Sequence, residues 1–233
     1  MARRRVNTTK YEIIQVATRL FLTNGYSATA PKHVCEELDI STGNLTYYFP
    51  TKEHLLVVLV KMLCTFQREA VEKTEESGQT SLFAICMEMA TMAAMCEESE
   101  IAKDLFLSAY SSPMCLDYIR KNDNERAKLI YGEYCPDWDD ARYAEAEVLV
   151  SGIEYATMMT TGDPVPLEER IRGAVNNIMR IYNVPEEVRE RKIRKVLKLD
   201  YRTLSRRVLE GFRQFVDQVN RHAFEELLGK DDE

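Results

Sequence analysis

Apolar and polar positions alternate along the start of the chain with the spacing of a helix. Ile13, Ile14, Ala17, Leu20 and Phe21 recur at intervals of three and four residues, which predicts one apolar helix face. A threonine at position 8 or 9 can cap this helix. The Asn-Gly pair at 24–25 ends it, because glycine suits the left-handed position that follows a helix.

Two short helices and a longer one are predicted next. The first begins at Thr29 and carries Pro31 in its first turn, where proline is tolerated. The second is capped by Ser41 and stopped by Pro50, and a longer helix follows over 51–66. The apolar positions of these three helices are Val34, Cys35, Leu38, Leu45, Phe49, Leu55, Leu56, Leu59, Met62, Leu63 and Phe66.

Two short helices joined by a tight turn and braced by longer helices are typical of a helix-turn-helix, whose second helix enters the major groove of DNA. The motif covers about residues 30–49, and the reading helix lies near 41–49. Its hydroxyls, amide and rings can contact base edges, phosphates and sugars. On spacing alone, a small helical bundle without a ligand is the alternative. The Arg3-Arg4-Arg5 run ahead of it is either a solvated tail or an arm on the DNA backbone or minor groove.

The rest of the chain also has helical patterns, so the predicted fold is all-α. We expect a helix-turn-helix DNA-binding domain of three helices over 7–67 and a helical ligand-binding and dimerisation domain over 68–233. The helices expected in the second domain cover 81–97, 101–110, 114–134, 141–161, 167–182, 188–199 and 204–228.

Composition agrees with a soluble helical protein. Apolar residues make up 45% and charged residues 30% of the 233 residues, and Gly (9) and Pro (7) are few. No apolar run reaches the length that spans a bilayer and no apolar signal core opens the chain, so a cytoplasmic protein without a membrane partner is expected. The first 63 residues carry +3 of the net charge of −7, which indicates a small basic module on an acidic remainder of −10.

The chemistry-bearing residues show no pattern of an enzyme. Nucleophile–base motifs, phosphate loops and metal-ligand spacings are lacking, and only three histidines occur, so no catalysis, metal or cofactor is expected. The six cysteines form no C-x-x-C pair and fall mostly in apolar helical patterns, which favours free buried thiols. Oxidant sensing by the cysteines at 86 and 96 is the less favoured alternative.

The N-terminal residues also resemble a known family. The motif runs Ile14-x-x-Ala17-x-x-x-Phe21-x-x-x-Gly25-Tyr26-x-x-Thr29 and continues Ile40-Ser41-x-Gly43-x-Leu45-x-x-Tyr48-Phe49-Pro50-x-Lys52-x-x-Leu55. Over about residues 8–63 this pattern resembles the TetR (tetracycline-repressor-like) family. The resemblance implies an all-helical homodimeric transcription regulator, usually a repressor, whose variable C-terminal domain binds a small molecule and then releases the operator.

The resemblance also assigns roles. It places Thr29 and Lys52 at DNA phosphates. Three positions depart from the family pattern: Thr46 stands for a usual Tyr, Thr42 for a frequent Lys, and Asp39 for a usual Gly. Because aspartate tolerates the left-handed region, we expect the turn to survive. The predicted DNA-binding residues are Arg4, Arg5, Thr29, Lys32, Thr42, Gly43, Asn44, Thr46, Tyr47, Tyr48 and Lys52.

Four methionines between 87 and 95 indicate either a soft core or an adaptable pocket for an apolar or aromatic ligand. The periodicity favours a core, and the family resemblance gives the pocket equal weight. A small organic effector, neutral or weakly polar, is the expected ligand. The predicted pocket residues are Met87, Met92, Met95, Cys96, Tyr110 and Trp138.

Two helices, expected over 141–161 and 167–182, carry matching apolar stripes. The stripes either face the chain's own core or form a four-helix bundle with a second copy, and the resemblance favours the homodimer. Beyond them, residues 189–213 are basic, and a solvated face beside the acidic body is favoured over a second nucleic-acid surface. The predicted dimer-interface residues are Leu149, Gly152, Ile153, Ala156, Ile171, Val175 and Ile178.

These observations predict a ligand-responsive repressor that binds a palindromic operator on double-stranded DNA as a homodimer. The alternative is a helical protein-interaction module whose DNA-binding head does not function.

Overall fold

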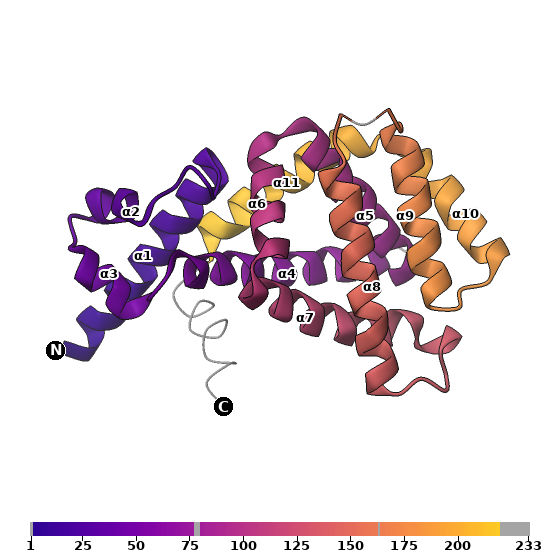
Figure 1. Ribbon diagram of the computed structural model, residues 1–233, viewed down its shortest axis with the longest axis horizontal. Coiled ribbons are helices and arrows are strands. Elements are labelled where there is room, and N and C mark those ends of the chain that lie inside the picture. Colours follow the sequence, from indigo (N-terminus) through magenta and orange to yellow (C-terminus); the bar gives the residue numbers. More distant parts are fainter. Residues whose placement is uncertain (1, 77–79, 163, 220–233) are drawn as a thin grey trace.

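The computed structural model describes residues 2–76, 80–162 and 164–219. Within these ranges the chain forms α-helices and one short 3-10 turn, without strands, which confirms the predicted all-α fold (Figure 1). The helices are α1 (Ala2–Asn24), α2 (Pro31–Leu38), α3 (Thr42–Tyr48), α4 (Lys52–Glu76), α5 (Ser81–Glu98), α6 (Glu100–Ser111), α7 (Pro113–Tyr131), α8 (Asp140–Met159), α9 (Leu167–Ile181), α10 (Glu186–Leu197) and α11 (Tyr201–Gln218), with the 3-10 turn η1 (Gly132–Tyr134).

The first three helices and the start of α4 form a head at one end of an elongated molecule (Figure 1). The apolar stripes predicted from the sequence meet in its core, where Ile13, Ile14 and Leu45 are at most 2% exposed. Burial of this face stabilises the head by about 25 cal/mol for each Å² of apolar surface removed from water. The helix-turn-helix is therefore held by the residues that its periodicity indicated.

Two helix starts differ from expectation. The first helix begins at Ala2, not after a threonine at position 8 or 9 as expected. Residues 2–9 contain no glycine or proline, so nothing in this stretch interrupts the helix. The second begins at Pro31 with Ala30 as its N-cap, so the predicted start at Thr29 is wrong. The backbone N–H of Ala30 donates to Nδ1 of His33 at 3.1 Å, which satisfies one of the free donors of that end.

Two predicted turn features are confirmed. Asp39 adopts φ 50°, in the left-handed region, and so replaces the glycine that the family usually has there. Ser41 caps α3, since its hydroxyl accepts the backbone N–H of Asn44 at 3.2 Å.

Helix α4 connects the head with the rest of the molecule (Figure 1). It extends from Lys52 to Glu76, ten residues beyond the expected end, and at 1.5 Å per residue it is about 37 Å long. The predicted domain boundary at residue 67 therefore lies inside a continuous helix. Tertiary packing against α5 and α7 accompanies this additional length.

The body consists of α5–α10 around the largely buried α5, as its all-round apolar pattern predicted. All six cysteines are free and buried, which confirms the expectation of buried thiols. Burial raises the pKa of both Cys86 and Cys96 to about 12, which disfavours the reactive thiolate. None of the helices in the described ranges combines the length and the hydrophobicity that crossing a bilayer requires.

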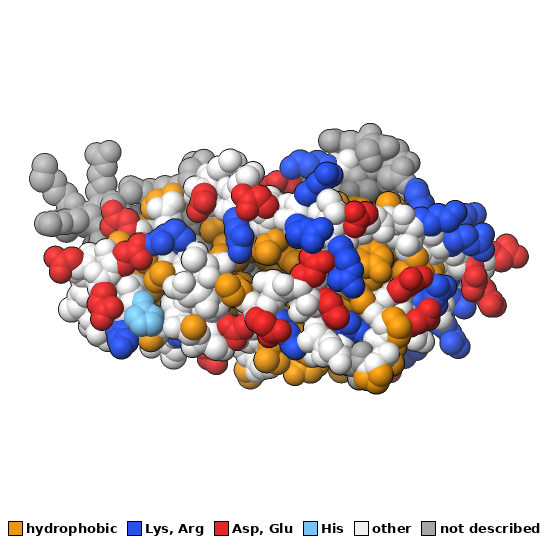
Figure 2. All heavy atoms as spheres, turned by 90° about the horizontal axis from the view of Figure 1, so that it is seen from above, with side chains coloured by type: hydrophobic (Ala, Val, Ile, Leu, Met, Phe, Trp, Pro, Cys, Tyr) orange, Lys and Arg blue, Asp and Glu red, His pale blue; other side chains and the backbone are white. Residues whose placement is uncertain are grey.

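Helix α11 returns from the body towards the head along α5 (Figure 1). Two of its basic residues, Arg202 and Arg206, form ion pairs with Glu98 at 3.3 Å, so pairing with the acidic body is confirmed for them. Figure 2 shows further basic side chains, with acidic ones among them, at the end of the molecule that contains α10. The predicted continuation of α11 beyond residue 219 lies outside the described residues.

Candidate DNA interface and regulatory cavity

Helix α3, the predicted reading helix, presents its polar side to solvent. Leu45 is 2% exposed and points into the head core, whereas Tyr47 is 77% exposed. This alternation follows from the helical period, since two residues turn a side chain through about 200°. The other predicted contacts of this helix, Thr42, Gly43, Asn44 and Thr46, are also exposed.

The two adjacent tyrosines of α3 have different surroundings. Their ring centroids lie 5.0 Å apart in an edge-to-face arrangement. Tyr48 is partly buried against the head core, so the exposed ring of Tyr47 contacts a partly buried neighbour. The hydroxyl of Thr46 donates to the carbonyl of Thr42 at 3.1 Å, so in this structure it is turned towards its own helix.

Two residues that the family resemblance places at phosphates are used inside the head. Thr29 is 1% exposed, and its hydroxyl donates to the carbonyl of Gly25 at 2.8 Å. The ammonium of Lys52 donates to the carbonyl of Tyr26 and lies 3.8 Å from the centroid of that ring. Desolvation lowers the pKa of Lys52, while Asp104 opposes that shift. The phosphate contacts of both residues stay predictions.

The remaining predicted DNA contacts lie on α1 and α2. Lys32 is exposed on the first turn of α2. Arg4 and Arg5 lie within α1, but the structure does not describe their side chains.

Asp104 of α6 is a head–body contact that sequence reasoning missed. Its Oδ2 accepts the backbone N–H of Ser27 at 2.8 Å, and its other oxygen accepts the hydroxyl of the same serine. Gly25, at φ 90°, lies so close that an added Cβ would be 2.9 Å from Oδ2. Asp104 lies 77 residues further along the chain, on another helix, so the sequence around Ser27 gives no signal of this contact.

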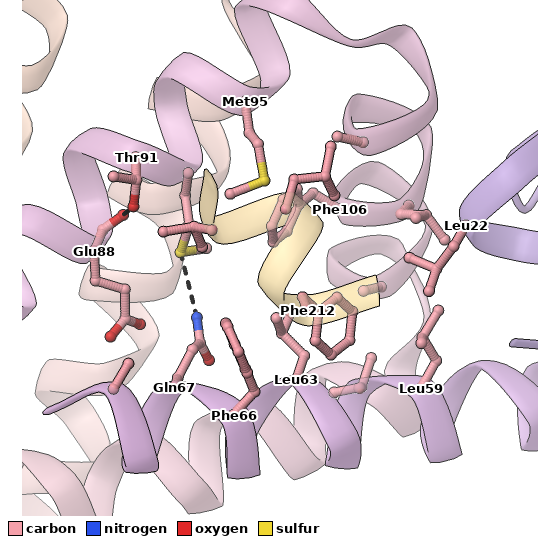
Figure 3. Close-up of a pocket in the computed structure, with 18 of the residues that line it drawn as sticks. Leu22, Leu59, Leu63, Phe66, Gln67, Glu88, Thr91, Met95, Phe106 and Phe212 are labelled. Atoms are coloured by element: carbon pink, nitrogen blue, oxygen red, sulfur yellow. Dashed lines mark hydrogen bonds between the residues drawn. The ribbon is translucent and has the colours of Figure 1, made fainter. Parts of the chain in front are cut away.

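An apolar cavity of about 140 Å³ lies between α1, α4, α5, α6 and α11 (Figure 3). The predicted pocket residues Met87, Met92 and Met95 line it. Sequence reasoning missed the walls that other helices supply, because a periodic stripe does not reveal its partner. These walls include Leu22 of α1, Leu59, Leu63 and Phe66 of α4, Phe106 of α6 and Phe212 of α11.

Polar groups gather at one end of this cavity, opposite Leu22 and Leu59 (Figure 3). The Gln67 amide donates to the sulfur of Met92 at 3.5 Å, a weak partner for an amide. Glu88 forms an ion pair with Arg126, whose Nη2 lies 2.6 Å from Oε2. The cavity thus has apolar walls and one hydrogen-bonding end.

Three of the predicted pocket residues do not line this cavity, and their assignment to a ligand pocket stays a prediction. Cys96 is wholly buried in the body core. Trp138 follows η1 and packs with its ring centroid 5.2 Å from that of Tyr143. Tyr110 lines a smaller adjoining cavity of about 30 Å³, where its hydroxyl donates to Oε2 of Glu154 at 2.8 Å.

The body core also contains acidic groups that sequence reasoning missed. Glu147 is 4% exposed and accepts the hydroxyl of Tyr182. Burial, together with the charge of Asp123, raises the pKa of Glu147 to about 7. Burial also raises the pKa of Glu154 and that of Asp123. The body therefore contains carboxyl groups that hold protons at a higher pH than solvated ones do.

The predicted dimer stripe divides between two environments. On α8, Leu149 is 55% exposed, Gly152 and Ala156 are exposed, and Ile153 is partly buried. The prediction is wrong for the three residues of α9, which are at most 5% exposed because α9 packs between α5, α8 and α10 of the same chain. These residues are Ile171, Val175 and Ile178. Val148, 51% exposed on α8, was missed.

Comparisons with known proteins agree with the arrangement of the head. Residues 13–59 match the model of the family described as bacterial regulatory proteins, tetR family. The chain is 40% identical over 53 residues to the HTH-type transcriptional regulator QacR of Staphylococcus aureus (strain Mu50 / ATCC 700699), which covers 23% of this chain and 28% of that protein. It is 32% identical over 71 residues to the HTH-type transcriptional regulator HbdR of Aromatoleum sp. (strain CIB), covering 30% and 31% of the two chains. The chain thus spans less than a third of either regulator's length.

Among solved structures, a gamma-butyrolactone receptor (ArpA like protein) aligns over 89% of this chain and 99% of its own. The sequence identity is 19% and the TM-score is 0.41.

Proposed function

We propose that the protein is a DNA-binding transcriptional regulator that reads DNA through α3, because residues 13–59 of its head match the model of the tetR family of bacterial regulatory proteins. The observation that carries this proposal is the 77% exposure of Tyr47 on a helix held in place by the buried Leu45 and Phe49. A large ring exposed to solvent beside an exposed amide and hydroxyls is suited to contacts with sugars, thymine methyl groups and base edges.

The regulator acts in this proposal as a homodimeric repressor on a palindromic operator. One helix-turn-helix offers few contacts, and two heads related by a two-fold axis fit half-sites about 34 Å apart. The outward face of α8 supports such pairing, because Val148 and Leu149 are more than half exposed and Gly152 beside them allows close approach.

The effector in this proposal is a neutral or weakly polar organic molecule that occupies the cavity between α4, α5, α6 and α11. Its apolar walls supply burial, and the flexible side chains of Met87, Met92 and Met95 adapt to shape. The effector releases DNA only if it binds the DNA-incompetent conformation more tightly, because equal affinity for both conformations shifts neither population.

The test is selection of DNA by the purified full chain from random genomic fragments. A regulator enriches one palindromic sequence, whereas a helical protein-interaction module with a non-functional head enriches none. Tyr47→Ala should weaken binding to the enriched sequence by about 1–3 kcal/mol, because it removes ring contacts while Leu45 and Phe49 still hold α3. Circular dichroism melting provides the folding control. Unchanged affinity of the variant would contradict the assignment of the reading face.

A further inference from the structure

Helix α11 is a wall of the regulatory cavity and also a part of the head. Leu204, Val208 and Leu209, in its first half, line the cavity. Val216 and, at its C-cap, Val219 are buried in the core of the head. Phe212 belongs to both, since it lines the cavity and packs in the head core. A shift of α11 therefore changes the cavity and the support of the head together.

Polar contacts attach the end of α11 to α1. The hydroxyl of Tyr11 donates to the carbonyl of Val219 at 3.0 Å. The guanidinium of Arg213 donates to the carbonyl of Leu22 at 3.3 Å. Leu22 itself lines the cavity, so this contact joins α11 and α1 at the cavity wall.

The other end of α11 is attached to the body. Arg202 and Arg206 both pair with Glu98, the last residue of α5. Between the two ends, Phe66 of α4 packs on α11 with its ring centroid 5.5 Å from that of Phe212. The helix thus spans from body to head with attachments at both ends.

The volume of the cavity requires a wall to move. About 140 Å³ is close to the 150 Å³ of an engineered cavity that holds benzene, whereas binding sites for organic ligands typically measure 300–1,000 Å³. Helix α5 is enclosed by α4, α8, α9, α10 and α11. Helix α11 packs on α1, α4 and α5, and its opposite side, with Arg207, Glu210 and Gln214, is exposed. Moving α11 outwards therefore disturbs less packing than moving α5.

We propose that α11 is the movable wall of the cavity and a strap that fixes the orientation of the head, so that a ligand filling the cavity lifts α11 and releases the head. This inference rests on the proposed function and concerns the regulation of the same cavity. Releasing the heads leaves α3 intact but lets the distance between the two heads vary. Operator binding must then fix this distance again, and the entropy cost of doing so lowers the affinity for a site with two half-sites.

A wedge at Gly211 tests the strap without any ligand. A Cβ added there would lie 3.5 Å from the ring of Phe66, an ordinary contact, so Gly211→Ala should bind operator within twofold of the unmodified protein. The longer side chain of Gly211→Leu cannot fit between α11 and Phe66. We expect it to lower operator affinity at least tenfold. Gly173→Leu on α9, where nothing lies within 4 Å of an added Cβ, is the matched control.

A distance measurement distinguishes release of the heads from general damage. Spin labels at Glu36→Cys, on the exposed side of α2, report the separation of the two heads in the homodimer. We expect one narrow distance distribution for the unmodified protein and for Gly211→Ala, and a broad one for Gly211→Leu. A narrow distribution and unchanged operator affinity in folded Gly211→Leu would overturn the strap.

The paired variant Tyr11→Phe with Arg213→Ala covers the case in which Gly211→Leu does not fold. It removes the two hydrogen bonds to α1 described above without inserting volume, and we expect a three- to fivefold loss of operator affinity. Unchanged affinity of this variant would also contradict the strap. Failure of the proposed function is distinguishable, because the unmodified protein would then enrich no DNA or give no dipolar signal between heads.

Discussion

The head and the body of this protein differ in what their cores contain. The head core is apolar, and the partly buried Lys52 lies over the aromatic rings of Phe21 and Tyr26 at its edge. The body core contains carboxyl groups such as Glu147 whose pKa is raised by burial. An apolar core specifies one rigid arrangement, whereas buried acids cost stability that depends on pH. The predicted reading surface therefore lies on the part with the apolar core. The cavity lies between the two cores, since Leu59 and Phe212 of the head core and Met92 of the body core all line it.

Separating two copies of the chain should have the largest effect on DNA binding. Gly152 is exposed on α8 beside Val148 and Leu149, with no atom within 4 Å of an added Cβ, so the monomer tolerates a larger side chain there. In Gly152→Arg, a long charged side chain would stand in the proposed dimer interface. We expect the variant to sediment as a folded monomer and to lose specific operator binding.

Analytical ultracentrifugation at micromolar concentration, with DNA binding measured in parallel, checks this expectation. Glu145→Arg, about two turns before Gly152 on the exposed side of α8, separates the effect of an added charge from the effect of blocking close approach at Gly152. A monomeric unmodified protein would count decisively against the dimer.

The acids of the body core should make stability depend on pH. Burial raises the pKa of Glu147 from 4.5 in the unfolded chain to about 7 in the folded protein, so the unfolded chain loses this proton first as pH rises. The contribution of Glu147 to the free energy of unfolding should therefore be largest below about pH 4.5. This contribution should fall by on the order of 2–3 kcal/mol as pH rises from about 4.5 to about 7. Glu147→Gln keeps an acceptor for the Tyr182 hydroxyl and should remove this part of the slope.

Urea unfolding between pH 5 and 8 measures the slope. Glu145→Gln on the same helix is the control, since that side chain is exposed. Equal slopes in the unmodified protein and Glu147→Gln would show that Glu147 does not carry the pH dependence.

The same contrast explains which features the sequence could predict. The head was predicted well because its helices lie close together in the chain, and its apolar stripes have few partners to choose from. Ser41 and Asp39 act through local backbone geometry and were recognised. Thr29 was wrongly predicted to begin α2, because its hydroxyl donates to the carbonyl of Gly25 in the preceding turn.

In the body, the sequence predicted helices but not their partners. The apolar stripe of α9 was assigned to a dimer, and the structure buries Ile171 and Val175 against the chain's own helices. Periodicity identifies a face that needs cover without saying what covers it. Similarly, Glu147 has the sequence pattern of a solvated helix position, and only the tertiary contact with Tyr182 shows that it is buried.

The smallest effect on DNA binding is expected at Lys52, for which two roles are possible: a contact inside the head and a contact with a DNA phosphate. The family resemblance predicts a phosphate contact, while in this structure the ammonium is held by the carbonyl and ring of Tyr26. A phosphate contact carries no sequence information, so its loss in Lys52→Ala should weaken all duplexes alike. It should also make the salt slope of binding shallower by about one unit for each subunit.

Binding of operator and unrelated duplexes at several salt concentrations decides between the two roles. Lys32→Ala, on the exposed start of α2, gives the change expected from an unconstrained surface cation. If Lys52→Ala lowers thermal stability and leaves the salt slope unchanged, Lys52 supports the turn at Tyr26 and does not meet DNA. A shallower slope would mean that Lys52 leaves Tyr26 when DNA binds, so that contact with DNA would itself loosen the turn that Asp104 attaches to the body.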